Sequence, residues 1–394
     1  MLRAGVGQST DVSTERAAEE AAKQAMAHAR ISRADVAVVF FTVEHAAHKR
    51  ELIETLRRVV HTDQLVGSSA AGVLTGSGEV EGTSALAVLV LSSDDIQSEP
   101  FLFTSLRGRE DQIGHAMTRF RQRVEGQNSL LALFPDTYNG QPQKLLQAIE
   151  SEMGFVPVVG AGSSENGMAQ VTYQLCGDSL DTNAVAGLHL GGSFEALIEI
   201  TQGCQPITKP MVITKAEKNS IYEIDHRPAI EVFAQTLKGP LAEDLRRALM
   251  YLFVGLPADA KENSVAPGQY MVRNIIRIDP NNGLLGVAEE VTEGEVMIFT
   301  LRDGQRARDD LSQMLERQIE RLADRKPAFG FYFNCCARGN SLYGVPGIDT
   351  AYIRQALGDF PLIGFFGGYE LAPLGRANRL FAYTGVLALI TEAG

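Results

Sequence analysis

The stretch DVAVVFFTV, residues Asp35–Val43, is an uninterrupted run of β-branched and aromatic residues. Such a run is typical of a strand that is covered on both faces, because polar residues do not alternate with apolar ones. Two comparable apolar runs, Asn128–Phe134 and Ala328–Phe333, occur further along the chain. After each run the sequence predicts a polar loop, an amphipathic helix and a second, shorter strand. The stretch at 35–43 is therefore the first strand of a unit that recurs.

The second strand of each unit leads into a turn of small residues. The three turns are Leu65–Gly72 (LVGSSAAG), Val158–Ser164 (VVGAGSS) and Pro361–Gly368 (PLIGFFGG). A returning strand is predicted after each of them. Internal repetition of this kind indicates that copies of one supersecondary unit pack together. We expect an α/β (α+β) fold in which layered mixed β-sheets carry flanking helices.

The length of 394 residues exceeds what a single core usually supports, so two or three domains are expected. Between the second and third copies lies a segment of a different kind. Residues 194–222 resemble consecutive strands interrupted by Pro206 and Pro210, which are excluded from central strands. We place the boundary in this region and expect two tightly packed domains, 1–210 and 220–394.

The composition excludes several classes of protein. The chain carries 48 Asp and Glu against 36 Lys and Arg, a net charge of −12, so it repels a nucleic-acid backbone. No apolar run reaches the roughly 20 residues that cross a bilayer, and the first residues lack the apolar core of a signal peptide. The four cysteines form no C-x-x-C pair. We expect a cytoplasmic protein without membrane insertion.

Common catalytic motifs are missing. The chain has no G-x-S-x-G elbow and no Gly-Lys dipeptide, so neither an α/β-hydrolase nucleophile nor a P-loop is predicted. We therefore expect a non-enzymatic protein. An enzyme that uses Cys336 as a nucleophile is one alternative, because Arg338 lies close enough in sequence to lower a thiol pKa. A docking scaffold with no small ligand is another.

The loops after the predicted strands hold the candidate ligand-binding residues. Arg338 would clamp a carboxylate through its planar guanidinium. Glu370, with Tyr369 directly before it, would accept an ammonium group, or would form a structural bridge with Arg338. Cys336 is either a soft ligand or a small buried residue. Asp136 occupies the corresponding loop of the second copy.

Serine pairs in two of the glycine-rich turns complete this set. Ser68 and Ser69 in the first copy, and Ser163 and Ser164 in the second, combine hydroxyls with backbone N–H groups that suit a small polar ligand. The alternative is that small residues stand there because two chain segments cross closely.

The same stretches, read in order, resemble the FIST family, with its N-terminal and C-terminal domains covering nearly the whole chain. The motifs that carry the resemblance are Gly7–Asp11, Leu65–Gly72, Val159–Ser164, Asp225–Ala229, Asn334–Gly339, Gly364–Pro373 and Tyr383–Gly385. The resemblance implies a sensory module that binds a small ligand, amino acids in particular, and signals through a separate protein. A histidine kinase or a cyclic-di-GMP signalling protein is the partner it implies.

Some stand-alone members of the family are haem proteins that sense nitric oxide and control a histidine kinase. Haem is therefore a possible cofactor by resemblance, with His45 at a strand end as the first candidate for the axial ligand. The main hypothesis from the sequence is a cytoplasmic sensor of an amino acid or a similar carboxylate.

Overall fold

The computed structural model describes residues 2–120, 128–237, 239–259, 263–265 and 268–393. The chain forms two compact units, and both are discontinuous in sequence. Unit 1 comprises Met1–Ile200, Leu311–Leu380 and Gly385–Gly394, and unit 2 comprises Thr201–Asp310 and Phe381–Thr384. The division of the sequence at 1–210 and 220–394 stays a prediction.

Unit 1 contains the three predicted repeats, here called A, B and C. Repeat A consists of β1 (Leu2–Ser9), α1 (Thr14–Ala29), β2 (Val36–Thr42), α2 (Lys49–Val60), β3 (Leu65–Ala70), β4 (Gly72–Thr75), β5 (Gly78–Glu81) and β6 (Leu86–Ser93). Repeat B consists of β7 (Ile96–Thr104), α3 (Glu110–Ala116), β8 (Asn128–Pro135), α5 (Pro142–Met153), β9 (Val158–Ala161), β10 (Gln174–Cys176), β11 (Ser179–Asp181) and β12 (Ala184–Gly192). Repeat C consists of β13 (Phe194–Gln202), α8 (Gly304–Leu322), β22 (Phe329–Cys335), α9 (Gly339–Tyr343), α10 (Ile348–Leu357), β23 (Leu362–Gly367), β24 (Glu370–Leu374), β25 (Ala377–Phe381) and β26 (Thr384–Glu392).

Each repeat contributes to a six-stranded mixed sheet, and the three sheets have equivalent strand orders. The orders are β1-β6-β2-β3-β10-β11, β7-β12-β8-β9-β24-β25 and β13-β26-β22-β23-β4-β5. The last two strands of every sheet form a hairpin that belongs to another repeat. The β4–β5 hairpin of repeat A joins the sheet of repeat C. The β10–β11 hairpin of repeat B joins the sheet of repeat A, and the β24–β25 hairpin of repeat C joins the sheet of repeat B. The exchange is cyclic, so no repeat completes its own sheet. The predicted fold class and the internal repetition are confirmed.

Equivalent glycines mark the same point in the three sheets. The parallel pairing sets Gly67 opposite Val39, Gly160 opposite Leu133 and Gly364 opposite Tyr332. A Cβ atom on any of these glycines would stand 1.7–2.0 Å from the carbonyl oxygen of the residue opposite. The close approach of two backbones therefore requires glycine, which explains why the turns share this residue.

On β2, β8 and β22, the residue that follows the position opposite the glycine is a phenylalanine. Phe40, Phe134 and Phe333 meet one another, with ring centroids 5.1, 6.2 and 6.0 Å apart. All three are fully buried. Equivalent residues from the three repeats therefore pack together on an approximate three-fold axis of unit 1. We call this set the phenylalanine cluster.

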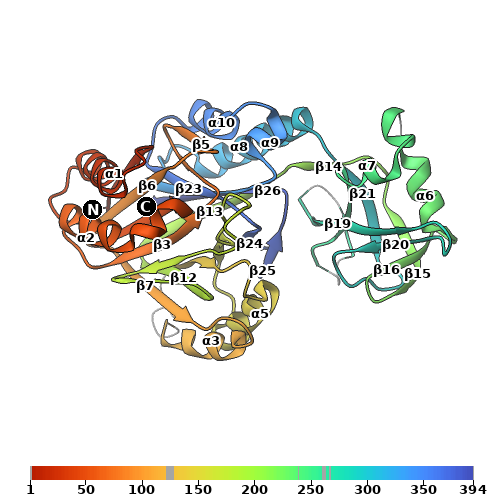
Figure 1. Ribbon diagram of the computed structural model, residues 1–394, viewed down its shortest axis with the longest axis horizontal. Coiled ribbons are helices and arrows are strands. Elements are labelled where there is room, and N and C mark those ends of the chain that lie inside the picture. The colour runs from red at the N-terminus through yellow and green to blue at the C-terminus, as the bar shows by residue number, and fades with distance from the viewer. Residues whose placement is uncertain (1, 121–127, 238, 260–262, 266–267, 394) are drawn as a thin grey trace. The chain divides into compact units, whose positions relative to one another are not determined.

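Helices cover the outer faces of the sheets at three corners of unit 1 (Figure 1). α1 packs on α2 and α3 packs on α5, while α8 and α10 share one apolar cluster. The side chain of Ser13 caps α1 by accepting the N–H of Arg16. Among the described residues, no helix is long and apolar enough to cross a membrane.

The main segment of unit 2 interrupts repeat C, and its boundaries fall at the end of β13 and within α8. Its strands are β14 (Cys204–Pro206), β15 (Met211–Glu217), β16 (Ser220–Ile224), β17 (Arg227–Pro228), β18 (Leu252–Pro257), β19 (Tyr270–Asp279), β20 (Leu284–Val287) and β21 (Val296–Arg302), and its α-helices are α6 (Ala229–Thr236) and α7 (Leu245–Ala248). Six of the strands close on themselves in the order β15-β16-β20-β19-β18-β21-β15. Closure removes the free sheet edges between these six strands and encloses an apolar core of its own.

Candidate functional site

The glycine-rich turns of the three repeats meet at the carboxyl ends of the parallel strands. Ser69 Oγ of repeat A donates to the carbonyl of Ser164 in repeat B (3.1 Å). Ser164 Oγ in turn donates to the carbonyl of Phe366 in repeat C. Cys336 Sγ donates to the same Phe366 oxygen, at 3.4 Å. Ligands of α/β proteins commonly bind at this edge of a sheet, so the meeting point is a candidate site. We call Ser69, Ser164, Cys336 and two nearby carboxylates, Glu81 and Glu370, the axial cluster.

Cys336 is the solvent-facing member of the axial cluster. The residue is exposed, yet desolvation by surrounding protein atoms raises the pKa of its thiol to about 12. Glu370 and Glu81 raise this pKa further, and a hydrogen bond with Ser164 opposes them. Solvent therefore reaches the residue from one side while protein atoms and negative charge surround the sulfur on the others.

The pKa bears directly on the alternative in which Cys336 acts as a nucleophile. At pH 7.4 we expect iodoacetamide to alkylate Cys336 about a hundredfold more slowly than it alkylates N-acetylcysteine, because so little thiolate is present. Peptide mapping by mass spectrometry over a time course measures the rate, and a Cys336→Ser variant identifies the labelled peptide. Alkylation as fast as that of the free thiol would restore the nucleophile hypothesis.

The role of Arg338 differs from the expected one. Its side chain is fully buried and pairs with Asp349 of α10 at 3.1 Å. Asp349 also accepts from the hydroxyls of Tyr332 (2.8 Å) and Tyr343 (2.7 Å) and from the amide of Asn334 (2.9 Å). Burial acts to lower the pKa of Arg338, and the charge of Asp349 more than reverses that effect. Arg338 thus clamps a carboxylate, as its chemistry suggested, but the carboxylate belongs to the protein itself.

Two glutamates from the exchanged hairpin of repeat A lie against repeat C. Glu79 accepts the backbone N–H and the hydroxyl of Thr350, at 2.9 and 3.2 Å. Desolvation, with the nearby charge of Asp349, raises the pKa of Glu79 to about 7. Glu81 accepts the N–H of Asn340 through Oε1 (2.9 Å), and desolvation also raises its pKa. Sequence reasoning missed both glutamates, because nothing local indicates that this hairpin pairs with another repeat.

Asp136 serves the loop in which it stands. Its carboxylate accepts the N–H groups of Tyr138 (2.7 Å), Asn139 (3.0 Å) and Asn183 (2.8 Å), and the side chain is fully buried. The Tyr138 hydroxyl donates to Glu165 at 2.6 Å, which raises the pKa of Tyr138 to about 12. The expected ligand-binding role of Asp136 is therefore replaced by a structural one, since its oxygens already hold the turn.

The four serines and the Tyr369–Glu370 pair do not all reach solvent. The serine pairs of the two turns do not occupy equivalent positions. Ser68 and Ser69 directly follow Gly67, whereas two residues separate Gly160 from Ser163 and Ser164. Ser68, Ser69 and Ser163 are fully buried, Ser164 is 7% exposed, and Ser163 Oγ donates to a strand carbonyl at 3.3 Å. Glu370 is fully buried, and Tyr369, 8% exposed, packs in the apolar cluster of repeat B. Among the predicted residues, Ser69, Ser164, Cys336 and Glu370 are brought together.

His45 is held by hydrogen bonds on both sides of its ring. Nδ1 lies 2.9 Å from the hydroxyl of Thr14, and Nε2 lies 3.0 Å from that of Ser84. The side chain is buried, and desolvation lowers its pKa. Coordination of a haem iron would break one of these bonds, so the structure does not favour His45 as an axial ligand. In the described part of the chain, no three His, Cys, Asp or Glu side chains are placed to hold a metal ion.

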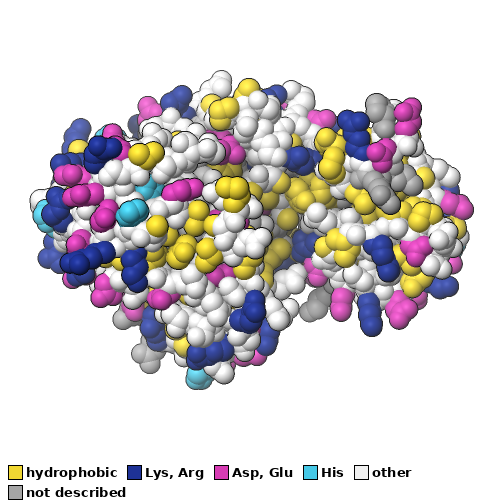
Figure 2. Space-filling model, viewed as in Figure 1, with side chains coloured by type: hydrophobic (Ala, Val, Ile, Leu, Met, Phe, Trp, Pro, Cys, Tyr) yellow, Lys and Arg dark blue, Asp and Glu magenta, His cyan; other side chains and the backbone are white. Residues whose placement is uncertain are grey.

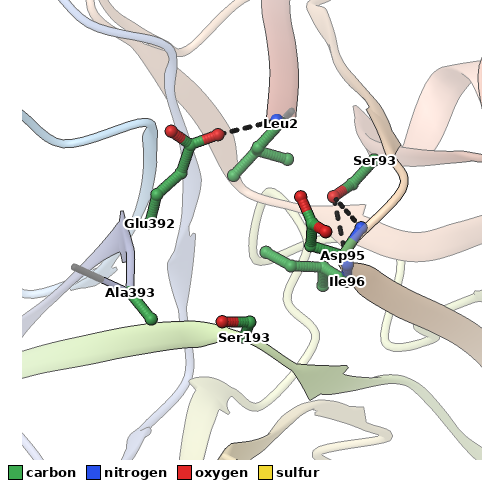
Figure 3. A pocket seen from close by; sticks show the side chains of 7 residues that line it. All are labelled: Leu2, Ser93, Asp95, Ile96, Ser193, Glu392 and Ala393. Carbon is green, nitrogen blue, oxygen red and sulfur yellow. Dashed lines mark hydrogen bonds between the residues drawn. The ribbon is translucent and has the colours of Figure 1, made fainter.

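A cavity lies at the opposite ends of the strands. It has a volume of ≈ 260 Å³ and is lined by the starts of β1 and β7 and the ends of β6 and β26 (Figure 3). Its walls include Asp95, Ser193 and Glu392, and the Glu392 carboxylate accepts the N–H of Leu2 at 2.8 Å. None of the predicted ligand-binding residues lines it.

Comparison with known proteins identifies both halves of the chain. Residues 35–227 match the model of the FIST N domain, and residues 229–373 match that of the FIST C domain. An uncharacterised protein of Mycobacterium tuberculosis is 29% identical over 394 residues, which cover 99% of this chain and 100% of that protein. One of Mycobacterium bovis is 29% identical over 395 residues (99% of each chain).

More distant matches are weaker. An uncharacterised protein of Methanocaldococcus jannaschii is 20% identical over 346 residues, covering 82% of this chain and 63% of that protein. Among solved structures, a cyanuric acid hydrolase from A. caulinodans aligns over 100% of both chains with a TM-score of 0.40 and 10% identity. That likeness is too low to support an inference.

Proposed function

The chain belongs to the FIST family, and from this premise we propose that it is a sensor of a small amine-bearing molecule, such as an amino acid, that binds at the axial cluster. FIST domains are recognised as sensory domains. The observation that carries the proposal is the solvent-open Cys336, placed where turns from all three repeats join and where the neighbouring charges are carboxylates.

The charges of the site favour an amine over a carboxylate as the recognised group. Arg338, the cation expected to hold a carboxylate, is buried and paired with Asp349. Glu81 is only partly buried and uses Oε1 for Asn340, which leaves Oε2 for a ligand. An ammonium group at Glu81 would form a charge-assisted hydrogen bond and relieve the repulsion between nearby acidic groups. An amino acid meets this requirement through its ammonium end.

Signalling would follow from the way the site joins the repeats. Glu81 comes from repeat A but lies in the sheet of repeat C, so a ligand bound there contacts two repeats at once. A ligand shifts a conformational equilibrium by its differential affinity for the two states. The proposed output is a change of shape read by a separate protein, a histidine kinase or a cyclic-di-GMP signalling protein. The four free cysteines support a reducing compartment, and we place the sensor in the cytoplasm.

The test is a calorimetric and thermal-shift screen of the intact chain with alanine, propylamine and propionate as matched probes, extended to the other amino acids. Compounds with an ammonium group are expected to raise the melting temperature, since they bind only the folded state. Glu81→Gln should weaken their binding about tenfold or more, because a hydrogen bond to a charged group is lost.

The matched control is Glu217→Gln, which removes the same charge from an exposed strand position in unit 2. It should leave amine binding unchanged. The proposal fails if propionate binds as well as alanine, if no amine binds at millimolar concentration, or if both variants weaken binding equally.

A further inference from the structure

Three arginines from separate segments line one hollow of unit 1. Arg3 lies on β1, Arg30 follows the last residue of α1, and Arg33 stands in the loop before β2. With Ser92, Ser93 and Asp94 at the end of β6, they border a hollow of ≈ 650 Å³. The charged groups of this lining carry a net charge of +2, in a protein whose net charge is −12. We call it the arginine hollow.

The three guanidinium groups are not held by carboxylates of the described part of the protein. Several arginines elsewhere pair with carboxylates, as Arg16 does with Asp11 and Arg317 with Glu199. On the face drawn in Figure 2, basic and acidic side chains are interspersed over the surface. Within the described residues, Arg3, Arg30 and Arg33 form no ion pair. In the lining the three positive charges face a single carboxylate, that of Asp94, so they repel one another and a bound anion would reduce that repulsion.

Structural roles use only a small part of the available donors. Arg3 Nη1 donates to the carbonyl of Arg30 at 3.1 Å, which satisfies one carbonyl at the end of α1. A guanidinium has five N–H donors, so most of those on Arg3 remain for a ligand. The end of a helix favours nearby cations, which explains Arg30, but it gives no reason for Arg33 to face the same hollow.

Ser93 adds a hydroxyl whose orientation is set by its neighbours. Its Oγ accepts the N–H groups of Asp95 (3.1 Å) and Ile96 (3.0 Å), as Figure 3 shows. Because the oxygen is used as an acceptor, the hydroxyl proton is left to donate. Ser93 borders both the cavity of Figure 3 and the arginine hollow. The hollow therefore offers cations together with a neutral donor.

We propose that the arginine hollow binds the phosphoryl group of a small phosphorylated molecule. Guanidinium forks match the oxygens of phosphate, and several converging cations suit a group with more than one negative charge. The volume falls in the usual range for small-molecule sites, about 300–1,000 Å³. The site is independent of the axial cluster, because it lies at the end of β6 that is remote from the carboxyl end of β2.

The experiment is isothermal titration calorimetry of the intact chain with inorganic pyrophosphate, in low salt, with sulfate as the competing anion. One pyrophosphate per chain should bind, at least tenfold more tightly than sulfate. The double variant Arg3→Gln/Arg33→Gln should weaken binding tenfold or more, since two charge-assisted contacts are removed. Both side chains are exposed, so the variant is expected to fold normally.

Arg376→Gln is the control for net charge, because Arg376 is exposed in the turn between β24 and β25 of the same unit. It should change pyrophosphate affinity less than twofold. The proposal is overturned if pyrophosphate does not bind at millimolar concentration, if sulfate binds equally well, or if Arg376→Gln weakens binding as much as the double variant. Amine binding at the axial cluster should be the same in the double variant, which separates this test from that of the proposed function.

Discussion

Asp349→Asn is expected to destabilise unit 1 by about 3–5 kcal/mol, the usual cost of leaving a buried charge without its partner. Arg338 and Asp349 are both fully buried, and Asp349 accepts from three further side chains. The substitution removes the negative charge and leaves the guanidinium enclosed in protein. Chemical denaturation followed by circular dichroism measures the loss as a lower midpoint concentration.

Two further variants give this prediction its control. Asp359→Asn changes an exposed aspartate just beyond α10, and we expect a change within about 0.5 kcal/mol. The double variant Arg338→Met/Asp349→Leu removes both charges, and it should recover much of the loss because buried pairs are often replaceable by apolar residues. A single variant that loses less than about 1 kcal/mol would contradict the internal role of Arg338.

Phe40→Ala is expected to cost about 3–5 kcal/mol, the range for removal of a large buried aromatic side chain. The ring of Phe40 lies 5.1 Å from that of Phe134 and 4.6 Å from that of Phe365, so its removal opens a cavity where the three sheets meet. Differential scanning calorimetry should show a lower melting temperature for the transition of unit 1.

The control substitution is Phe155→Ala, because Phe155 is 37% exposed and lies outside the phenylalanine cluster. It should cost markedly less than Phe40→Ala. If both variants lost the same free energy of unfolding, the contact between repeats in the phenylalanine cluster would not be especially important for stability.

Much of the fold could be predicted from short-range patterns. The apolar runs at 35–43 and 328–333 became β2 and β22, and the helix predicted after each run is α2 and α10, respectively. The recurrence of one glycine in each turn was likewise visible, and the structure explains it by the close approach of two backbones. Such features depend on residues near one another in the chain, so their periodicity is sufficient to predict them.

The candidate site was predicted only in part. The loops after the parallel strands lie together in the structure, because the carboxyl ends of parallel strands meet at one edge, and their ligand-binding role stays a prediction. The roles within them could not be chosen, since Arg338 and Asp136 use their polar atoms on partners that tertiary packing supplies. Asp349 is an acidic residue in the first turn of α10, which is a weak local signal, and nothing near it in sequence indicates its partner.

The sequence by itself determined the repeated unit, the type of its main strands and helices and the family to which the chain belongs. Only the tertiary structure decided which hairpin completes which sheet, and therefore that Glu79 and Glu81 of repeat A lie beside α9 and α10 of repeat C. The physical reason is that three similar hairpins satisfy the same backbone hydrogen bonds at a sheet edge. Local preference is nearly equal for each pairing, so the choice depends on how all three repeats bury their apolar faces together.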